Sequence, residues 1–413
     1  MIVVMGYIQL LPIASFEFYG DEGIVFDLTS NKRFFLSRND SEVLKQLLSG
    51  KALNKDELSK ELLSVIDGLL KEGMLYEYES PVYFTPFTLR NDFEIEGILD
   101  NPPRLNCIYI EASDSCNYKC DFCKQENLIH PCETCALWSN DNYNKKEKHY
   151  DKILDAVRRL TQMTFSSVCI LGGNPLLNWD FVNEIIKIVR EMSIKVPIFL
   201  TMNDLSFNDE DYGFIKQNNI NLRIVLTNDI ICMNSFEDAK VDDHYSKMLN
   251  KFEYLKMNNI PFEVVLIKKN SKIDYIKRII EERKYVFKEI EYIDYNKSPE
   301  NTISYEERKY LKIDDAFITK KYNRCLNNNI AISLNGNIKV CPALDDVIIN
   351  IYNDNIEKVF WDGKISQRWN ISRDDIFECN SCGLKWLCND CMAVLKKCKE
   401  KGKGGTYLCK KNQ

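Results

Sequence analysis

Three cysteines within eight residues form the segment of this sequence best suited to redox chemistry. They are Cys116, Cys120 and Cys123, and they follow an apolar run, Cys107–Ile110, that predicts a β-strand. Three thiols on one short loop can ligate three corners of an iron–sulfur cube, which leaves one iron open to another ligand. A zinc site is the alternative, although structural zinc sites usually have four ligands in paired CxxC units.

The spacing of these cysteines, with Phe122 directly before the last one, resembles the signature of the radical S-adenosylmethionine (SAM) superfamily. The resemblance implies a [4Fe-4S] cluster whose open iron chelates the amino and carboxylate groups of SAM, with Phe122 beside the cofactor. One electron, from a donor such as a flavodoxin or ferredoxin, would then cleave SAM to a 5′-deoxyadenosyl radical that abstracts hydrogen from the substrate. The three cysteines are thus the expected catalytic ligands.

A second expected contact with SAM is the segment Gly172-Gly173-Asn174-Pro175. It resembles the GGEP motif of the same superfamily, which contacts the amino group of SAM, but Asn174 stands where Glu is usual. An amide oxygen can still accept a hydrogen bond from an ammonium group, although the charge-assisted part is lost. An ordinary turn is the alternative interpretation. Weaker candidates are polar residues that end later strands and could equally cap the following helices: Thr201, Asn203, Thr227 and Asn228.

The C-terminal region contains a second group of cysteines. Two CxxC units in close succession would by themselves predict zinc, but the complete pattern, with Gly336 before Cys341, resembles the SPASM domain. That resemblance implies two auxiliary [4Fe-4S] clusters. By position, the first cluster would be bound by Cys325, Cys341 and Cys391, and the second by Cys379, Cys382, Cys388 and Cys409.

Two details of this assignment stay open. The last CxxC is one residue shorter than the usual spacing, so Cys398 is an alternative to Cys391. No fourth thiol for the first auxiliary cluster is evident near Cys325, which suggests a second open iron suited to a substrate thiolate. Between the first cysteine loop and the next helix, Cys132 and Cys135 form a lone CxxC, which we expect in a loop at the mouth of the active site.

Composition is that of an ordinary globular protein, with 413 residues, 45% hydrophobic and 28% charged. The net charge of −6 argues against nucleic acid as a partner. No apolar run approaches the roughly 20 residues that span a bilayer, and the first residues lack a secretory signal, so we expect a cytoplasmic protein without a membrane segment. In a reducing compartment, sixteen cysteines favour metal binding or catalysis over disulfides. Cys107, Cys169 and Cys232 lie in or beside apolar runs and are expected in the core.

The first 90 residues predict a small winged-helix-like domain. A hairpin is expected at Ile24–Leu28 and Arg33–Leu36, then a helix from Ser41, a second helix that ends at Gly73, and a strand at Met74–Tyr78. In this position the pattern resembles the precursor-peptide recognition domain of peptide-modifying radical SAM enzymes. The resemblance implies that a leader peptide binds by strand addition beside Phe34-Phe35-Leu36. A packing or dimerisation domain is the alternative, and the absence of a basic surface argues against DNA.

From about residue 104 to 296 the sequence alternates strand and helix patterns, which predicts parallel β/α units. Six units match the open, partial (β/α)6 TIM barrel of the radical SAM core, with its active site at the carboxyl ends of the strands. The expected strands are Leu105–Ile110, Val168–Leu171, Ile198–Thr201, Leu222–Leu226, Phe262–Ile267 and Ile290–Ile293.

The sequence therefore predicts an α/β chain of three domains: a recognition domain at 1–90, a partial barrel at 91–300 and a cysteine-rich iron–sulfur domain at 301–413. On the resemblances above, it would be a radical SAM enzyme that modifies a ribosomally made precursor peptide. The expected product is a thioether from a cysteine sulfur. Alternatives are carbon–carbon crosslinking, a sulfatase-maturase-like oxidation, or a non-catalytic, zinc-containing peptide-binding protein.

Overall fold

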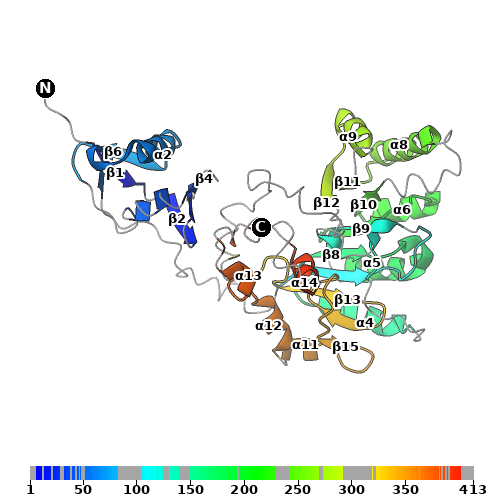
Figure 1. Cartoon of the computed structure of the whole chain (residues 1–413). Helices are drawn as coiled ribbons and strands as arrows, with labels where there is room; N and C mark the ends of the chain where they lie inside the picture. The colour runs from blue at the N-terminus through cyan, green and yellow to red at the C-terminus, as the bar shows by residue number, and fades with distance from the viewer. Residues whose placement is uncertain are drawn as a thin grey trace.

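The computed structural model describes most residues of 6–81, 104–138, 148–227, 241–291 and 319–400, with short gaps inside each range (Figure 1). No helix in these ranges is long and apolar enough to cross a membrane. Three residues named above lie outside the described part of the chain: Asn228, Cys232 and Cys409.

The N-terminal unit contains two three-stranded antiparallel sheets. In the first, β3 (Glu22–Asp27) pairs with β2 (Ala14–Tyr19) on one side and with β4 (Arg33–Leu36) on the other, so the expected hairpin is present. The sequence pattern did not predict β2 or the first strand of the second sheet. That sheet consists of β1 (Tyr7–Leu10), β5 (Leu53–Asn54) and β6 (Leu75–Tyr78).

Helix α2 (Lys60–Lys71) packs against these strands. It begins after Ser59, whose hydroxyl accepts a hydrogen bond from the Leu62 N–H. It is followed by Gly73, whose φ of +72° suits the left-handed position that commonly ends a helix. The helix buries Leu62, Ile66 and Leu69 in a core that the N-terminal unit forms by itself.

Six parallel strands form the main sheet, in the order in which they occur in the chain. The expected barrel strands are present, but the second and the last each begin three residues earlier than predicted, at Phe165 and Phe287. The added residues include polar ones, Ser166 and Ser167 in the second strand and Lys288 and Glu289 in the last, so these parts did not stand out as apolar runs. The strands are β7 (Leu105–Glu111), β8 (Phe165–Leu171), β9 (Ile198–Met202), β10 (Ile220–Leu226), β11 (Phe262–Lys268) and β12 (Phe287–Glu291).

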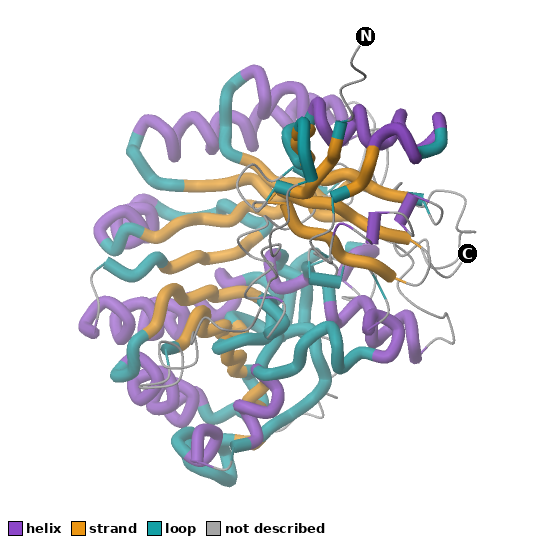
Figure 2. The backbone as a smooth tube through the Cα atoms, turned by 90° about the vertical axis from the view of Figure 1, so that its left-hand side faces the viewer, coloured by secondary structure: helices purple, strands orange, loops and turns teal. Residues whose placement is uncertain are grey.

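Helices alternate with these strands and flank the sheet (Figure 2). The third of them starts with a capping box, in which Asn208 and Asp211 each bond the other's backbone N–H. Side chains on one face of the sheet, such as Ile108, Ile170 and Leu200, form the main core with the helices. The helices are α4 (Tyr150–Thr161), α5 (Trp179–Met192), α6 (Asp209–Gln217), α8 (Val241–Met257) and α9 (Ile273–Glu282).

The C-terminal region continues the same sheet. Strand β13 (Asn329–Ile332) pairs in parallel with β7, and β14 (Asn337–Lys339) and β15 (Ile349–Asn350) follow in antiparallel order. Its apolar residues join the core of the barrel. The C-terminal region is therefore built onto the β7 edge of the barrel, at the strand that leads into the first cysteine loop. The helices described in this region are α11 (Lys358–Trp361), α12 (Lys364–Trp369), α13 (Phe377–Asn380) and α14 (Met392–Glu400).

Candidate functional site

The loop that carries Cys116, Cys120 and Cys123 leaves the carboxyl end of β7, where the sequence predicted it. The sulfur of Cys116 accepts hydrogen bonds from the Tyr118 N–H at 3.4 Å and from Asn203 Nδ2 at 3.6 Å. The sulfur of Cys123 accepts one from the Leu137 N–H at 3.4 Å. Donors aimed at sulfur favour the thiolate, which is the form that ligates a metal.

Burial raises the pKa of Cys123, and the neighbouring Cys116 adds to this, while the Leu137 N–H opposes it. In the absence of a metal the thiol is therefore held protonated, and ligation would have to displace its proton. Within the described residues, no three Cys, His, Asp or Glu side chains converge closely enough to share a single metal ion.

Phe122 anchors this loop. Its ring is buried and packs with Val225 of β10 and Val265 of β11 on the inner face of the barrel. A cofactor contact by Phe122 stays a prediction, because its observed partners are apolar side chains. The aromatic residue before the last cysteine thus fixes the loop over the open end of the barrel.

Gly172 and Gly173 let the second loop pack directly on the first. Their φ angles are +98° and +59°, which favour glycine. A Cβ on Gly173 would lie 2.5 Å from the carbonyl oxygens of Ser113 and Ser115, and one on Gly172 would lie 3.1 Å from Trp138 Nε1. We predicted that these glycines give a ligand access to the backbone; what they approach here is the backbone that leads into Cys116.

Asn174 holds the turn that follows. Its backbone N–H donates to the Ser115 carbonyl at 2.8 Å, and its Oδ1 accepts from the Leu176 N–H at 3.1 Å, which caps the short helix η5 (Pro175–Asn178). Its Nδ2 lies 3.5 Å from Asp204. The amide is fully buried, and contact with SAM by Asn174 or Pro175 stays a prediction.

Two polar atoms at the end of β9 are buried without a hydrogen-bond partner: Thr201 Oγ1 and Asn203 Oδ1. A buried polar atom that stays unpaired costs about 1–3 kcal/mol, so a polar ligand that reaches both atoms would stabilise this end of the barrel. Asn203 also donates to Cys116, so the unpaired oxygen and the cysteine loop are adjacent. These residues fit a polar cofactor such as SAM. Thr227, directly after β10, is also buried, but it has interaction partners of its own.

The inner face of the barrel contains ionic groups that we did not predict. Arg223 of β10 forms an ion pair with Glu263 of β11 and lies 4.0 Å from the ring centroid of Phe199. Lys288 of β12 contacts Glu263 at 3.5 Å and Glu133 at 3.2 Å. The available signal was a charged residue inside an apolar strand, Arg223 in β10 and Glu263 in β11, because alternate residues of a strand point to opposite faces.

Two of the three expected core cysteines, Cys107 and Cys169, also lie on this inner face. Cys107 Sγ donates to Cys169 Sγ across 3.4 Å, and Arg223 Nη1 lies 3.7 Å from the same sulfur. The bond from Cys107, aided by Arg223, lowers the pKa of Cys169. Both thiols are buried, as expected, but beside a cation rather than in a purely apolar core.

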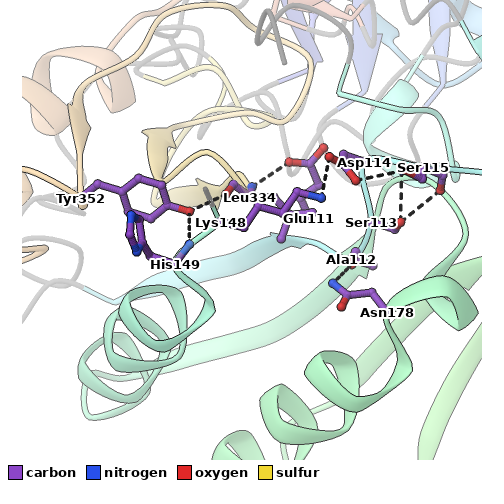
Figure 3. A network of polar contacts seen from close by, with 10 residues as sticks. All are labelled: Glu111, Ala112, Ser113, Asp114, Ser115, Lys148, His149, Asn178, Leu334 and Tyr352. Carbon is purple, nitrogen blue, oxygen red and sulfur yellow. Dashed lines mark hydrogen bonds and ion pairs between the residues drawn. The ribbon is translucent and has the colours of Figure 1, made fainter. Parts of the chain in front are cut away.

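A polar network fixes the cysteine loop to the C-terminal region (Figure 3). Glu111, the last residue of β7, is fully buried and accepts a hydrogen bond from the Leu334 N–H at 2.8 Å. Tyr352 donates to the Leu334 carbonyl at 2.6 Å and accepts from the His149 N–H at 3.2 Å. The ring of Tyr352 covers Gly336, where a Cβ would approach it to 2.7 Å. Glycine between Cys325 and Cys341 is thus required by packing.

The structure brings Cys325, Cys341 and Cys391 together, from three separate segments. Burial raises the pKa of Cys325 to about 11 and that of Cys341 to about 12, and in both cases the nearby Cys391 adds to the shift. Of the two alternatives from the sequence, Cys391 is thus near Cys325 and Cys341, while the side chain of Cys398 lies outside the described part of the structure.

Cys379, Cys382 and Cys388 lie in or after α13. The Cys382 N–H bonds the Cys379 carbonyl at 2.8 Å, and Arg373 Nη1 lies 3.8 Å from the Cys379 sulfur. Cys388 follows on the same segment. Arg373 is itself buried, and its charge opposes the rise that burial causes in the pKa of Cys325 and Cys391, so this cation lies near both cysteine groups.

Comparison with known proteins places the barrel in a family. Residues 110–282 match the model described as "Radical SAM superfamily", while no curated protein matches the sequence. A structure of anSMEcpe with bound AdoMet is similar over 74% of this chain and 94% of its own, with 15% identity and a TM-score of 0.49. SuiB of Streptococcus suis, bound to its precursor peptide SuiA, is similar over 98% of this chain and 100% of its own, with 16% identity and a TM-score of 0.44.

Both structural likenesses have low identity and TM-scores below 0.5, so the assignment depends on the family match. That match begins within β7 and includes the cysteine loop, the Gly172–Pro175 segment and the ends of β9 and β10. It confirms the radical SAM resemblance drawn from the cysteine spacing. The chain therefore contains a domain of the radical SAM superfamily at residues 110–282.

Proposed function

We propose that this chain is a radical SAM enzyme that modifies a ribosomally made precursor peptide. The observation that carries the proposal is the geometry at the carboxyl end of the barrel. There, the Cys116 sulfur accepts a hydrogen bond from Asn203 Nδ2, while Asn203 Oδ1 and the nearby Thr201 Oγ1 are buried without a hydrogen-bond partner.

The residues of the chain have separable roles in this proposal. Cys116, Cys120 and Cys123 hold a [4Fe-4S] cluster, Asn203 orients one of its ligands, and Thr201 and Asn203 accept polar hydrogens of SAM. Gly172 and Gly173 let the second loop pack against the backbone that leads into Cys116. When bound, the cluster and SAM supply a 5′-deoxyadenosyl radical.

A peptide substrate is supported by the edge of the N-terminal sheet. Among the described residues β4 pairs only with β3. Asp27 N–H bonds the Lys32 carbonyl, and bonded pairs alternate along an antiparallel ladder. Phe34 and Leu36 therefore bond to β3, while the backbone groups of Phe35 point to the side of β4 away from β3.

This edge lies beside α2. The ring of Phe34 approaches Gly68 of the helix so closely that a Cβ there would lie 3.1 Å from it, and Phe35 is 44% exposed. An edge strand next to a helix is the geometry that strand addition uses. We therefore propose that a leader peptide binds along β4, against α2.

Phe35→Pro is expected to weaken leader binding roughly tenfold, because it removes one edge N–H worth about 1 kcal/mol and its ring obstructs the incoming strand. Proline is tolerated on an open edge, so the sheet should persist. Fluorescence anisotropy with a labelled leader peptide measures the effect. Phe35→Val, which keeps the N–H, is the matched control; equal affinity for the Pro and Val variants would contradict strand addition at β4.

The auxiliary cysteines support an oxidative outcome. We propose that the two C-terminal cysteine groups hold auxiliary [4Fe-4S] clusters that accept an electron after hydrogen abstraction. The product that we propose is a thioether between a cysteine sulfur and a carbon of the peptide. Carbon–carbon crosslinking and side-chain oxidation need the same cysteine groups and differ in what happens to the substrate cysteine.

Mass spectrometry of a cysteine-containing precursor co-expressed with this chain tests the function. We expect the precursor to lose two hydrogen atoms and the modified cysteine to resist alkylation. Loss of two hydrogens with every cysteine still alkylatable would favour a carbon–carbon crosslink or an oxidation instead. An unchanged precursor would contradict the proposal for that peptide.

A further inference from the structure

The lone CxxC between the first cysteine loop and α4 lies in a short, well-bonded loop. Its residues form the single turn η4 (Pro131–Glu133), and Thr134 bonds back to the Pro131 carbonyl through both its N–H and its hydroxyl, at 3.1 and 2.9 Å. The Ala136 N–H donates to the same hydroxyl at 3.3 Å. The two cysteines are therefore held in fixed directions.

This loop contacts a cysteine of the C-terminal group and a cysteine of the first cysteine loop. At one end, the His130 N–H donates to the sulfur of Cys391, a member of the C-terminal group. At the other end, the Leu137 N–H donates to the sulfur of Cys123, a member of the first loop. Eight residues thus connect a thiol of the C-terminal group to a thiol of the barrel.

The two cysteines of the CxxC lie near different thiols. Those near Cys132 are Cys341, Cys391 and Cys325. Those near Cys135 are Cys116, Cys120 and Cys123, and Cys135 also packs with Cys120 and Phe122. Tyr109 of β7 also lies near both Cys132 and Cys341, which supports the closeness of these two thiols.

We propose that Cys132 is the fourth ligand of the first auxiliary cluster, together with Cys325, Cys341 and Cys391. The inference rests on the proposed function only in assuming that these C-terminal cysteines hold a cluster. Four thiols, from segments up to 259 positions apart in sequence, then enclose one site. Four cysteine thiolates are the usual complement of a [4Fe-4S] cluster.

The charge and proton balance of this site is consistent with the assignment. Each ligation replaces an S–H bond by a bond between sulfur and iron, releases one proton to solvent and changes no oxidation state. The iron and sulfide come from the same supply as for the other clusters. A [4Fe-4S] cluster with four thiolate ligands carries a net negative charge, which a nearby cation stabilises, and the buried Arg373 guanidinium lies near Cys325 and Cys391.

The assignment revises the expectation of a second open iron. With Cys132 bound, the first auxiliary cluster is closed by protein ligands, so a substrate thiolate does not bind it. Thioether formation then needs the cluster only as an electron acceptor at a distance. The bridging loop also explains how the C-terminal group is fixed relative to the barrel, because Glu133 is tied to Lys288 of β12.

The test counts clusters rather than product. The parent is the variant with Cys116, Cys120 and Cys123 all changed to Ala. It lacks the SAM-binding cluster, whose open iron would itself give a three-iron signal, and it retains roughly eight irons in the two auxiliary clusters. After anaerobic reconstitution, mild ferricyanide oxidation should give the parent no EPR signal of a three-iron cluster. Adding Cys132→Ala should produce that signal and the loss of iron, as should Cys341→Ala. Adding Cys135→Ala, the matched control in the same loop, should leave the parent's iron and spectrum unchanged.

The assignment would be overturned if Cys132→Ala kept the parent's iron and stayed EPR-silent while Cys341→Ala lost iron and gave the signal. It would also be overturned if Cys135→Ala lost as much iron as Cys132→Ala. A second measurement needs no variant. In the reconstituted native chain, Cys132 should resist alkylation and become reactive after the iron is chelated; alkylation of Cys132 while iron is fully bound would also overturn it. Neither readout depends on a peptide, so the proposed peptide modification can fail while this assignment stands.

Discussion

Cys120→Ala is expected to reduce reductive cleavage of SAM by more than about 100-fold, since loss of even an outer partner of a metal ligand costs 10–100-fold. Two thiols would remain on a loop that needs three to hold a cluster. The loop itself should keep its place, because Phe122 anchors it by burial against Val225 and Val265. The effect therefore measures ligation and not folding.

The measurement is 5′-deoxyadenosine released from SAM under a chemical reductant, with iron content determined on the same samples. Cys107→Ala is the control, because Cys107 is a buried thiol on the strand that leads into the loop but contacts Cys169 instead. It should retain cleavage within a few-fold. Full activity in Cys120→Ala would show that the first loop does not hold the cluster.

Gly173→Ala is expected to cause the second large loss, in cleavage and in stability together. A left-handed position costs a residue with a Cβ about 1–3 kcal/mol, and here the Cβ would also lie 2.5 Å from two carbonyl oxygens of the Ser113–Ser115 backbone. Relief requires the backbone before Cys116 to move. We therefore expect a lower melting temperature and a cleavage rate reduced by more than about tenfold, as for a displaced metal ligand.

Two glycine variants separate the causes. Gly363→Ala has the same strain, with φ of +66°, but no atom within 4 Å of the new Cβ, so it reports strain alone. Gly213→Ala, inside α6, has neither strain nor collision and should be neutral or stabilising by about 0.5–1 kcal/mol. If Gly173→Ala behaved like Gly363→Ala, the close packing of the two loops would not matter for cleavage.

The barrel could be predicted from sequence because its signals are local. Apolar strands that alternate with amphipathic helices specify parallel β/α units, and five of the six strands overlap their predicted ranges closely. The extension of the sheet by β13–β15 could not be predicted in this way. It depends on pairing between Asn329 and Cys107, which are more than 200 residues apart, and local pattern carries no information about such pairs.

In the candidate site, too, residues with a local sequence signal could be predicted, and those with partners distant in sequence could not. The three thiols of the first loop follow from spacing alone, and Cys325, Cys341 and Cys391 follow from a resemblance. The proposed role of Cys132 in the C-terminal group was not predicted, because its proposed partners are distant in sequence and its spacing to Cys135 suggested a pair. Asn174 stood out as a departure from a motif, but its role as a helix cap required the position of Leu176 N–H.

The most direct test of the account is metal and product analysis of the native chain after anaerobic reconstitution with iron and sulfide. Three [4Fe-4S] clusters predict roughly twelve irons per chain, together with 5′-deoxyadenosine formed from SAM under reduction. Stoichiometric zinc in place of iron, with no deoxyadenosine formed, would contradict the account and identify a zinc-containing binding protein on a radical SAM barrel.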